Sequence, residues 1–186
     1  FIMTLPSGTV TFLFTDIEGS TKLAQEYPDE MPTLLARHHE ILNQSIQAHN
    51  GYAFQIVGDS FAVAFHSASD ALNAALNAQR LLQNEPWIPA PIKVRMGIHT
   101  GSAEWNGNDY LGYVTLARTH RVMSTAYGGQ IIVSNDVYRS IDTEDIFING
   151  DKITFRDFGL RRLKDLVEPV QLYQVVTDRL QSDFPP

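Results

Sequence analysis

The sequence contains no cysteine, which excludes both a disulfide scaffold and a zinc site with cysteine ligands. It also lacks a run of about eighteen apolar residues, the length that a transmembrane helix needs, and shows no basic leader before an apolar core. Basic residues are few, because 14 Lys and Arg stand against 21 Asp and Glu, for a net charge of −7. Nucleic-acid binding is not expected, since phosphate neutralisation needs clustered cations. These absences favour a cytoplasmic protein without a membrane segment.

The composition that remains is that of a globular domain. The chain has 186 residues, of which 44% are hydrophobic and 19% charged, and this is enough for one core. We interpret residues 9–178 as the domain, residues 1–8 as an N-terminal extension, and residues 179–186 as a tail or the start of a linker.

The first half of the chain alternates strand and helix patterns. Apolar and β-branched runs predict strands, and apolar residues at helical spacing predict helices. The order is strand, helix, strand, strand, helix, strand, over residues 9–15, 20–49, 52–57, 61–65, 68–82 and 92–100. This order is that of a ferredoxin-like β-α-β-β-α-β unit. The predicted fold class is therefore α+β, with a mostly antiparallel sheet and further strands at the C-terminus.

The second half is predicted with the same rules. The polar segment Gly101–Asp109 is expected to be a loop or hairpin tip. A helix, a strand, a short helix and two closing strands are expected after it, over residues 113–125, 130–134, 135–141, 152–166 and 170–176.

Two aspartates are expected to meet at one edge of this sheet. Asp16 follows the first strand and Asp59 precedes the third, and in this unit those two strands are antiparallel neighbours. Converging carboxylates suit Mg²⁺ or Mn²⁺, which prefer oxygen ligands. The alternative is ordinary turn chemistry at Asp59 and a capping or solvated role for Asp16.

The turn after Asp16 leads into a helix. Glu18, Gly19 and Ser20 form the turn, and Ser20 and Thr21 are suitable N-cap residues. The free N–H groups and the positive dipole end of a helix N-terminus favour phosphate. Two metal-binding aspartates beside a phosphate turn are typical of two-metal phosphoryl chemistry.

At this point the sequence resembles the catalytic domain of the class III nucleotidyl cyclases, the adenylyl and guanylyl cyclase family. The matching stretches occur in family order and cover nearly the whole chain: TFLFTDIEGSTKL, GYAFQIVGDSFAVAF, VRMGIHTGSAE, NDYLG, RVMSTAYGGQIIVS and FGLRRLKDLVEPVQLYQV. The opening TVTFLFTDIEGST is similar to that of bacterial members at the front of larger regulatory proteins. The resemblance implies a homodimer with sites shared between chains, fused to further domains.

The resemblance also implies roles for individual residues. Asp16 and Asp59, assisted by the Ile17 carbonyl, would hold two Mg²⁺ or Mn²⁺ ions. The turn Gly19–Thr21, which comprises Gly19, Ser20 and Thr21, would hold the β- and γ-phosphates, and Lys164 would contact the triphosphate. The implied reaction converts ATP to 3′,5′-cyclic AMP and pyrophosphate.

Base recognition departs from the family pattern. Gln55 stands where the family has an adenine-reading lysine, and Asp109 stands at the second base-reading position. Asp109 can accept from the adenine amino group and Gln55 can donate to N1, which favours ATP. A glutamine amide also offers an acceptor, so GTP or a pyrimidine nucleotide stays an alternative. Gln55 facing solvent as an ordinary strand residue is a further one.

The helix after NDYLG lacks the family's asparagine. One register places Ala117 and Arg121 at the family's Asn and Arg positions, and the other places Leu116 and His120 there. Thr115 or Arg118 is a candidate to compensate from one turn away. Arg118 and Arg121 share a helix face and can clamp phosphate as a pair. Surface charge is the alternative role for both, and a structural role is an alternative for Arg95.

The sequence therefore supports an adenylyl cyclase of low activity as one hypothesis. A cyclase-like nucleotide-binding or regulatory module with little or no turnover is the other, motivated by the missing asparagine, Gln55 and Asp165. A ferredoxin-like RNA-binding domain is disfavoured by the negative charge and the missing aromatic pattern.

Overall fold

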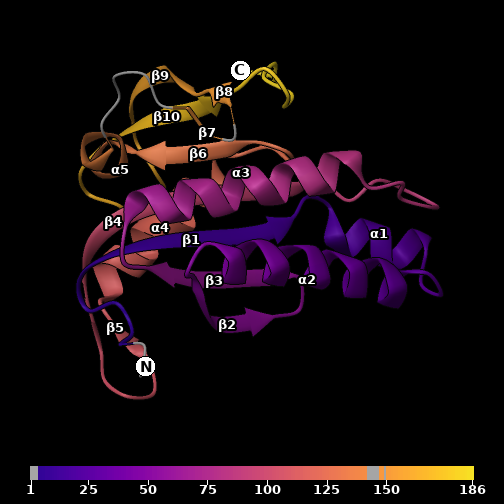
Figure 1. Ribbon diagram of the computed structural model, residues 1–186, viewed down its shortest axis with the longest axis horizontal. Helices are drawn as coiled ribbons and strands as arrows, with labels where there is room; N and C mark the ends of the chain where they lie inside the picture. The colour runs from indigo at the N-terminus through magenta and orange to yellow at the C-terminus, as the bar shows by residue number, and fades with distance from the viewer. Residues whose placement is uncertain (1–3, 142–146, 149) are drawn as a thin grey trace.

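The computed structural model describes residues 4–141, 147–148 and 150–186. In chain order the elements are β1 (Gly8–Ile17), α1 (Ser20–Glu26), α2 (Met31–Ala48), β2 (Tyr52–Val57), β3 (Ser60–Phe65), α3 (Ala68–Asn84), β4 (Val94–Trp105), β5 (Tyr110–Leu111), α4 (Tyr113–Ser124), β6 (Ile131–Ser134), α5 (Asn135–Ser140), β7 (Phe147–Ile148), β8 (Asp151–Lys152), β9 (Thr154–Arg161) and β10 (Val170–Val176) (Figure 1). Among the described helices, none combines the length and apolarity needed to cross a bilayer.

The main sheet has eight strands in the order β2-β3-β1-β4-β6-β10-β9, with β5 paired to β4. Strand β1 lies between β3 and β4 and is antiparallel to both. Strands β4 and β6 run parallel, and the other pairings of this sheet are antiparallel. The predicted α+β class and the mostly antiparallel sheet are therefore confirmed. The β-α-β-β-α-β order also holds, except that the helix predicted over residues 20–49 is divided into α1 and α2.

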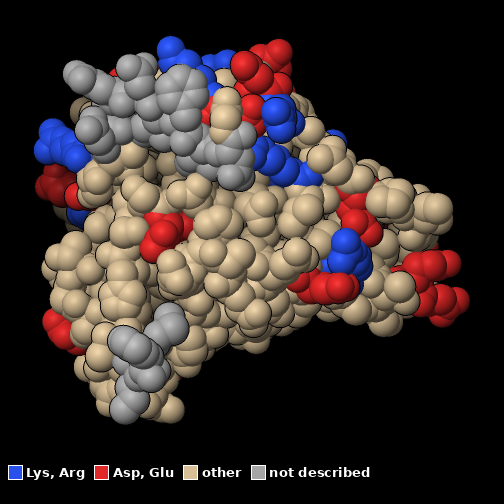
Figure 2. All heavy atoms as spheres, in the orientation of Figure 1, with Lys and Arg blue, Asp and Glu red and all other residues tan. Residues whose placement is uncertain are grey.

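Both faces of the sheet are covered, and the side chains of β1 point alternately to one face and to the other. Leu13 and Ile17 pack into the large core beneath α2 and α3. Phe12 and Phe14 point to the other face, where they join an aromatic cluster with Phe54. Figure 2 shows the outer surface of the α2 and α3 face, where charged side chains are sparse in the middle and gather near α1 and the C-terminal strands.

Helix α4 packs unusually close to strand β4. A Cβ on Gly97 would lie 2.3 Å from the Met123 backbone nitrogen, and one on Gly101 would lie 2.7 Å from the Thr115 hydroxyl oxygen. Only glycine allows this approach, since real Cβ atoms essentially never come within 3.0 Å. The glycines of β4 thus set the short distance between the sheet and α4. This helix carries the candidate arginines.

Several predicted boundaries were wrong. Strand β1 continues to Ile17, so Asp16 lies inside the strand and not after it. Strand β4 continues through Trp105, because its residues pair with β1 and β5 over half of the expected loop Gly101–Asp109. Strand β9 ends at Arg161, so residues 162–166 of the predicted closing strand lie outside it. Residues 1–3 of the predicted N-terminal extension lie outside the described residues.

The C-terminal segment 179–186 packs against the domain. The Ser182 carbonyl accepts hydrogen bonds from Arg156 and Gln174 at 3.2 and 2.9 Å. The ring of Phe184 stacks on that of Tyr127 at a centroid distance of 6.2 Å. This segment therefore lies beside the loop that follows α4.

Candidate functional site

The two candidate metal ligands lie at the same edge of the sheet. Asp59 occupies the tight turn between β2 and β3, next to Gly58, which has a left-handed backbone with φ of 59°. The Oδ2 atom of Asp59 accepts a hydrogen bond of 2.6 Å from the backbone N–H of Ile17, the residue after Asp16. The β1–β3 pairing thus brings together two carboxylates that are far apart in the sequence.

Arg95 forms an ion pair with the carboxylate of Asp16. Its Nε atom lies 2.6 Å from Oδ1 and its Nη2 atom 2.5 Å from Oδ2, in a two-pronged ion pair between directly opposed residues of β1 and β4. The hydrogen bonds to Asp16 raise the pKa of Arg95 above its usual value, against the opposing effect of burial. The guanidinium therefore supplies the positive charge that a cation would supply to Asp16.

The donor set can be tested against a divalent cation. Carboxylates from Asp16 and Asp59 are suitable hard ligands. Among residues 4–141, 147–148 and 150–186, no group of three or more His, Asp or Glu side chains is arranged to hold a metal. The residues fit a metal only when Arg95 turns away from Asp16, because both oxygens of that carboxylate are engaged. Sequence reasoning missed this contact, although Arg95 occupies the cross-strand position opposite Asp16.

The turn after β1 begins helix α1, but not with the caps that the sequence predicted. Gly19 is the N-cap, with a left-handed backbone at φ 68° and ψ 29°, and no side chain caps the helix. Ser20 and Thr21 are already helical, so the prediction that they act as caps was wrong. The Glu18 N–H donates to the Lys93 carbonyl at 2.9 Å, which ties the turn to the segment before β4. The first N–H groups of α1 have no acceptor inside the helix.

Helix α4 holds its two arginines in different surroundings. Arg121 donates through Nη2 to Asp165 Oδ2 at 2.6 Å, an ion pair in which the Asp165 side chain is 65% exposed. The Nε atom of Arg118 is buried and has no partner among the described residues. Asp165, one of the residues that motivated the hypothesis of a regulatory module, thus engages Arg121. Lys164 itself is exposed.

Thr115 is committed to the fold. It is buried, and its hydroxyl donates to the Ser102 carbonyl at 2.7 Å, so it does not replace the missing asparagine in this arrangement. Its neighbour one turn on, Thr119, donates to the Thr115 carbonyl at 2.8 Å. Of the two candidates to replace the asparagine, Thr115 and Arg118, only Arg118 has a side-chain atom, Nε, without a hydrogen-bond partner among the described residues.

A buried histidine lies on the strand beneath Arg118. His99 Nδ1 is 2.7 Å from the Ser134 hydroxyl. Burial lowers the pKa of His99 to about 4; the charge of Asp136 opposes this shift, and that of Arg118 adds to it. His99 is therefore neutral at pH 7, and its contacts are those of a core residue.

Gln55 and Asp109 lie on neighbouring elements of one chain, since the rings of the adjacent residues Phe54 and Tyr110 are 4.9 Å apart. Gln55 is exposed on β2 and lines a hollow of about 230 Å³ with Phe14 and His120. Asp109 is exposed in the hairpin between β4 and β5, where its carboxylate accepts from the Asn108 amide at 3.1 Å. Gln55 thus shares this hollow with His120. In the sequence analysis, His120 was a candidate only in the register that places it at the family's arginine position.

Among the described residues, the candidates fall into two groups that no hydrogen bond or ion pair links. Across the described part of the chain, no hydrogen bond or ion pair joins Asp16 or Asp59 to Arg118, Arg121, Asp109 or Lys164. One group contains the carboxylates and the turn, and the other contains α4, the hairpin and the β9–β10 loop.

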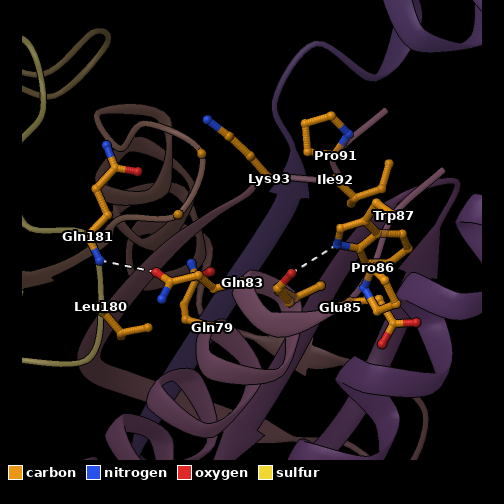
Figure 3. A pocket seen from close by; sticks show the side chains of 13 residues that line it. Gln79, Gln83, Glu85, Pro86, Trp87, Pro91, Ile92, Lys93, Leu180 and Gln181 are labelled. Carbon is orange, nitrogen blue, oxygen red and sulfur yellow. Dashed lines mark hydrogen bonds between the residues drawn. The ribbon is translucent and has the colours of Figure 1, made fainter. Parts of the chain in front are cut away.

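Figure 3 shows a cavity of about 390 Å³ on the α3 side of this sheet edge. Gln83 Oε1 accepts from the Gln181 N–H at 3.2 Å, and the Trp87 indole donates to the Leu82 carbonyl at 2.9 Å. Lys93 also lines this cavity, and none of the residues predicted to bind metal or nucleotide does so. It is therefore separate from the candidate site.

Comparison with known proteins defines the class of this domain. Residues 3–164 match the family model of the adenylate and guanylate cyclase catalytic domain. Adenylate cyclases of Trypanosoma brucei, solved in their monomeric state, superpose with a TM-score of 0.80 at 28% identity, over 94% of this chain and 92% of theirs. The adenylyl cyclase CyaB of P. aeruginosa superposes with a TM-score of 0.77 at 25% identity, over 94% and 96%.

Two curated relatives cover most of this chain, and one of them is named as an adenylate cyclase. An uncharacterized protein of Mycobacterium tuberculosis is 34% identical over 97% of this chain and 60% of its own length. A receptor-type adenylate cyclase of Trypanosoma brucei brucei is 29% identical over 91% of this chain and 17% of its own length. The chain belongs to the class III adenylate/guanylate cyclase family. It spans about three-fifths of the length of the mycobacterial relatives that it matches.

Proposed function

We propose that this chain is the catalytic domain of an adenylyl cyclase that converts ATP to 3′,5′-cyclic AMP and pyrophosphate at a homodimer interface. The observation that carries the proposal is the convergence of Asp16 and Asp59 beside the turn Gly19–Thr21. Family membership supports it, and so do the relatives named as adenylate cyclases.

One half of the site binds the metals and phosphates. Asp16, Asp59 and the Ile17 carbonyl would hold two Mg²⁺ or Mn²⁺ ions, after Arg95 releases Asp16. Bound there, such ions would supply Lewis-acid activation of the ribose hydroxyl and positive charge opposite the phosphates. The backbone of Gly19–Thr21 receives the β- and γ-phosphates. The released Arg95 guanidinium stays within reach of these phosphates.

The reaction is one in-line displacement. The ribose 3′-oxygen forms a bond to the α-phosphorus while the bond from the α-phosphorus to the α,β-bridging oxygen breaks. Pyrophosphate leaves with that oxygen, and the proton of the 3′-hydroxyl passes to solvent. Residues that hold the 3′-oxygen in line with the leaving group contribute by positioning.

The partner chain provides the other half of the site. Arg118 and Arg121 stabilise the negative charge that develops at the α-phosphate, and Lys164 contacts the triphosphate. To stabilise that charge, Arg121 must break its ion pair with Asp165 and bind the nucleotide instead. In the described part of one chain, Asp16 and Arg121 are held by different partners, Arg95 and Asp165, which is compatible with this division.

Base selection is assigned to Gln55 and Asp109 of that same partner chain. Asp109 accepts from the adenine amino group and Gln55 donates to N1, so ATP is the preferred substrate. Gln55 can also turn its amide oxygen toward a guanine N1–H. Discrimination against GTP is therefore expected to be weak, and relaxed specificity is the corresponding alternative.

The ion pairs favour a second candidate function. Arg95 neutralises Asp16, Arg121 is held by Asp165, and no asparagine stands on α4. A domain arranged in this way can bind nucleotide with little or no turnover and act as a regulatory module. The domain at residues 9–178 would then be the regulatory part of a longer protein, as the mycobacterial relatives are longer than this chain.

A product assay separates the two functions. The purified dimer is incubated with Mn²⁺ and each of the four nucleoside triphosphates, and cyclic nucleotide is measured by chromatography. A cyclase gives cyclic AMP that disappears in Asp59→Asn, while Arg139→Gln, on the exposed surface of α5, leaves the rate unchanged. A regulatory module gives metal-dependent ATP binding by calorimetry but no product at any enzyme concentration.

A further inference from the structure

The cavity of Figure 3 has the composition of a small-molecule site. It lies between the end of α3, the segment 85–93 and the C-terminal segment, and its volume is about 390 Å³. Its floor is apolar, because Leu82 and Ile92 line it and are only 3% and 2% exposed, and the half-buried indole of Trp87 lies beside them. A largely apolar cavity of this size with a few polar groups is typical of ligand sites.

Several polar side chains of the lining are already engaged. Gln83 uses both ends of its amide on the C-terminal segment: Oε1 accepts from the Gln181 N–H at 3.2 Å, and Nε2 donates to the Arg179 carbonyl at 2.9 Å. Both carboxylate oxygens of Glu85 accept from Arg37, at 2.9 and 3.0 Å. These groups shape the cavity, and their hydrogen bonds are spent within the protein.

Gln79 is different, because one end of its amide is free. The residue lines the cavity and is only 2% exposed. Its Nε2 atom donates to the Val94 carbonyl at 2.8 Å, which fixes the nitrogen on that side of the amide. No described residue donates a hydrogen bond to the Oε1 atom. A buried acceptor without a donor is unfavourable, so a ligand that donates to Oε1 gains free energy there.

Lys93 supplies the positive charge of the cavity. Figure 3 shows its side chain along the upper edge, with the Gln79 amide rising from α3 below. Within residues 4–141, 147–148 and 150–186, no carboxylate oxygen lies within 4.0 Å of the Lys93 ammonium. A single ammonium matches the one negative charge of a carboxylate better than the larger charge of a phosphate group.

We propose that this cavity binds a small aromatic carboxylate that carries a hydroxyl or N–H donor. The ring packs on the apolar floor beside Trp87, the donor bonds to Gln79 Oε1, and the carboxylate pairs with Lys93. None of the residues predicted to bind metal or nucleotide lines this cavity. The proposed binding is therefore independent of divalent metal and of cyclase activity.

The test uses simple probes on the intact chain in the presence of a chelator. The compounds 3-hydroxybenzoate, 4-hydroxybenzoate, benzoate and phenol are titrated by calorimetry, and the two isomers place the donor at different distances from the carboxylate. The better isomer should bind about fivefold more tightly than benzoate, which lacks the donor. It should bind about tenfold more tightly than phenol, which lacks the charge. Affinities no higher than that of benzoate or that of phenol would overturn the proposal.

Matched variants and the two tryptophans locate the binding. Lys93→Gln is expected to weaken hydroxybenzoate binding about tenfold, whereas Lys152→Gln, at an exposed lysine of β8, should leave it unchanged. The chain has only two tryptophans, so its NMR spectrum contains two indole N–H signals, which Trp105→Phe assigns. The ligand should shift the signal of Trp87 and not that of Trp105. Equal losses in the two lysine variants, or a shift of the Trp105 signal alone, would place the ligand elsewhere and refute the site.

Discussion

At the scale of single residues, the contact that controls the candidate metal site is the ion pair between Arg95 and Asp16. Its side chains are 29% and 17% exposed, so the pair is partly shielded from solvent. A cation can reach Asp16 only by displacing the guanidinium. The affinity for metal therefore includes the cost of separating this pair.

The first prediction is that Arg95→Gln binds Mn²⁺ more tightly in the absence of nucleotide. The gain should be about tenfold, because the competing cation and its repulsion of the metal are both removed. Mn²⁺ binding is measured by electron paramagnetic resonance, with Arg139→Gln as the control. Unchanged or weaker binding in Arg95→Gln would show that Asp16 is not a ligand or that Arg95 does not compete.

The second prediction concerns His38, which is fully buried on α2 against Phe61. Burial, with a smaller contribution from His39, lowers the pKa of His38 from 6.5 to about 3. Between these values the unfolded chain binds a proton that the folded chain does not. The contribution of His38 to the stability of the fold is thus complete above pH 6.5 and falls as the pH falls toward 3, by about 1.4 kcal/mol per pH unit.

Urea unfolding at pH 7.5, 6.0 and 5.0 measures this dependence. His38→Leu keeps a similar volume and removes the titration, so its free energy of unfolding should change less with pH than that of the original chain. His38 Nε2 has no partner among the described residues. The substitution removes the 3.0 Å contact of His38 Nδ1 with His39 Nδ1, but His39 Nδ1 keeps its 2.8 Å contact with the Leu35 carbonyl oxygen. Parallel pH profiles for the two chains would contradict the assignment.

The sequence could predict the juxtaposition of Asp16 and Asp59 but not the ion pairs. Strand order follows from local patterns, and it places the two aspartates at one edge. The contacts of Arg95 with Asp16 and of Arg121 with Asp165 depend on the register of β4 and on the path of the chain after β9. No local pattern fixes either of these.

At the scale of elements, the fold was predictable where the periodicity was strong. The helix predicted over residues 68–82 and the strands predicted over residues 52–57 and 61–65 correspond to α3, β2 and β3. The predicted end of strand β4, at Thr100, came too early, since the glycine and polar residues that follow are typical of a loop. In the structure β4 pairs with β1 as far as Ala103, so tertiary pairing overrides local propensity.

The third prediction tests the close packing of α4 on β4. Gly97→Ala puts a methyl group against the backbone of Met123, so it should destabilise the fold by about 2–3 kcal/mol, which is typical of overpacking. Gly107→Ala is the control: nothing lies within 4 Å of its Cβ, and only its left-handed backbone, with φ of 96°, opposes the change. Its cost should be about 1 kcal/mol. Urea unfolding compares the two, and equal costs would show that α4 can move away without loss.

At the scale of the whole molecule, the division of the candidate residues into two groups implies complementation between chains. In a two-fold dimer, each site takes its carboxylates from one chain and its α4 residues from the other. Asp59→Asn damages the first half and Arg121→Gln the second. A heterodimer of the two variants contains one site with both defects and one site with neither.

The fourth prediction is that mixing these two inactive variants restores activity. With random pairing, half of the dimers are heterodimers with one intact site, so about a quarter of the original rate should return. The control mixes Asp59→Asn with Asp16→Asn, whose defects lie in the same half, and no heterodimer then has an intact site. Cyclic nucleotide is measured after heterodimer formation has been established by differential tags. Restoration in the control mixture, or none in the first mixture, would show that the two groups do not meet across the interface, and each chain would have to complete its site from its own residues.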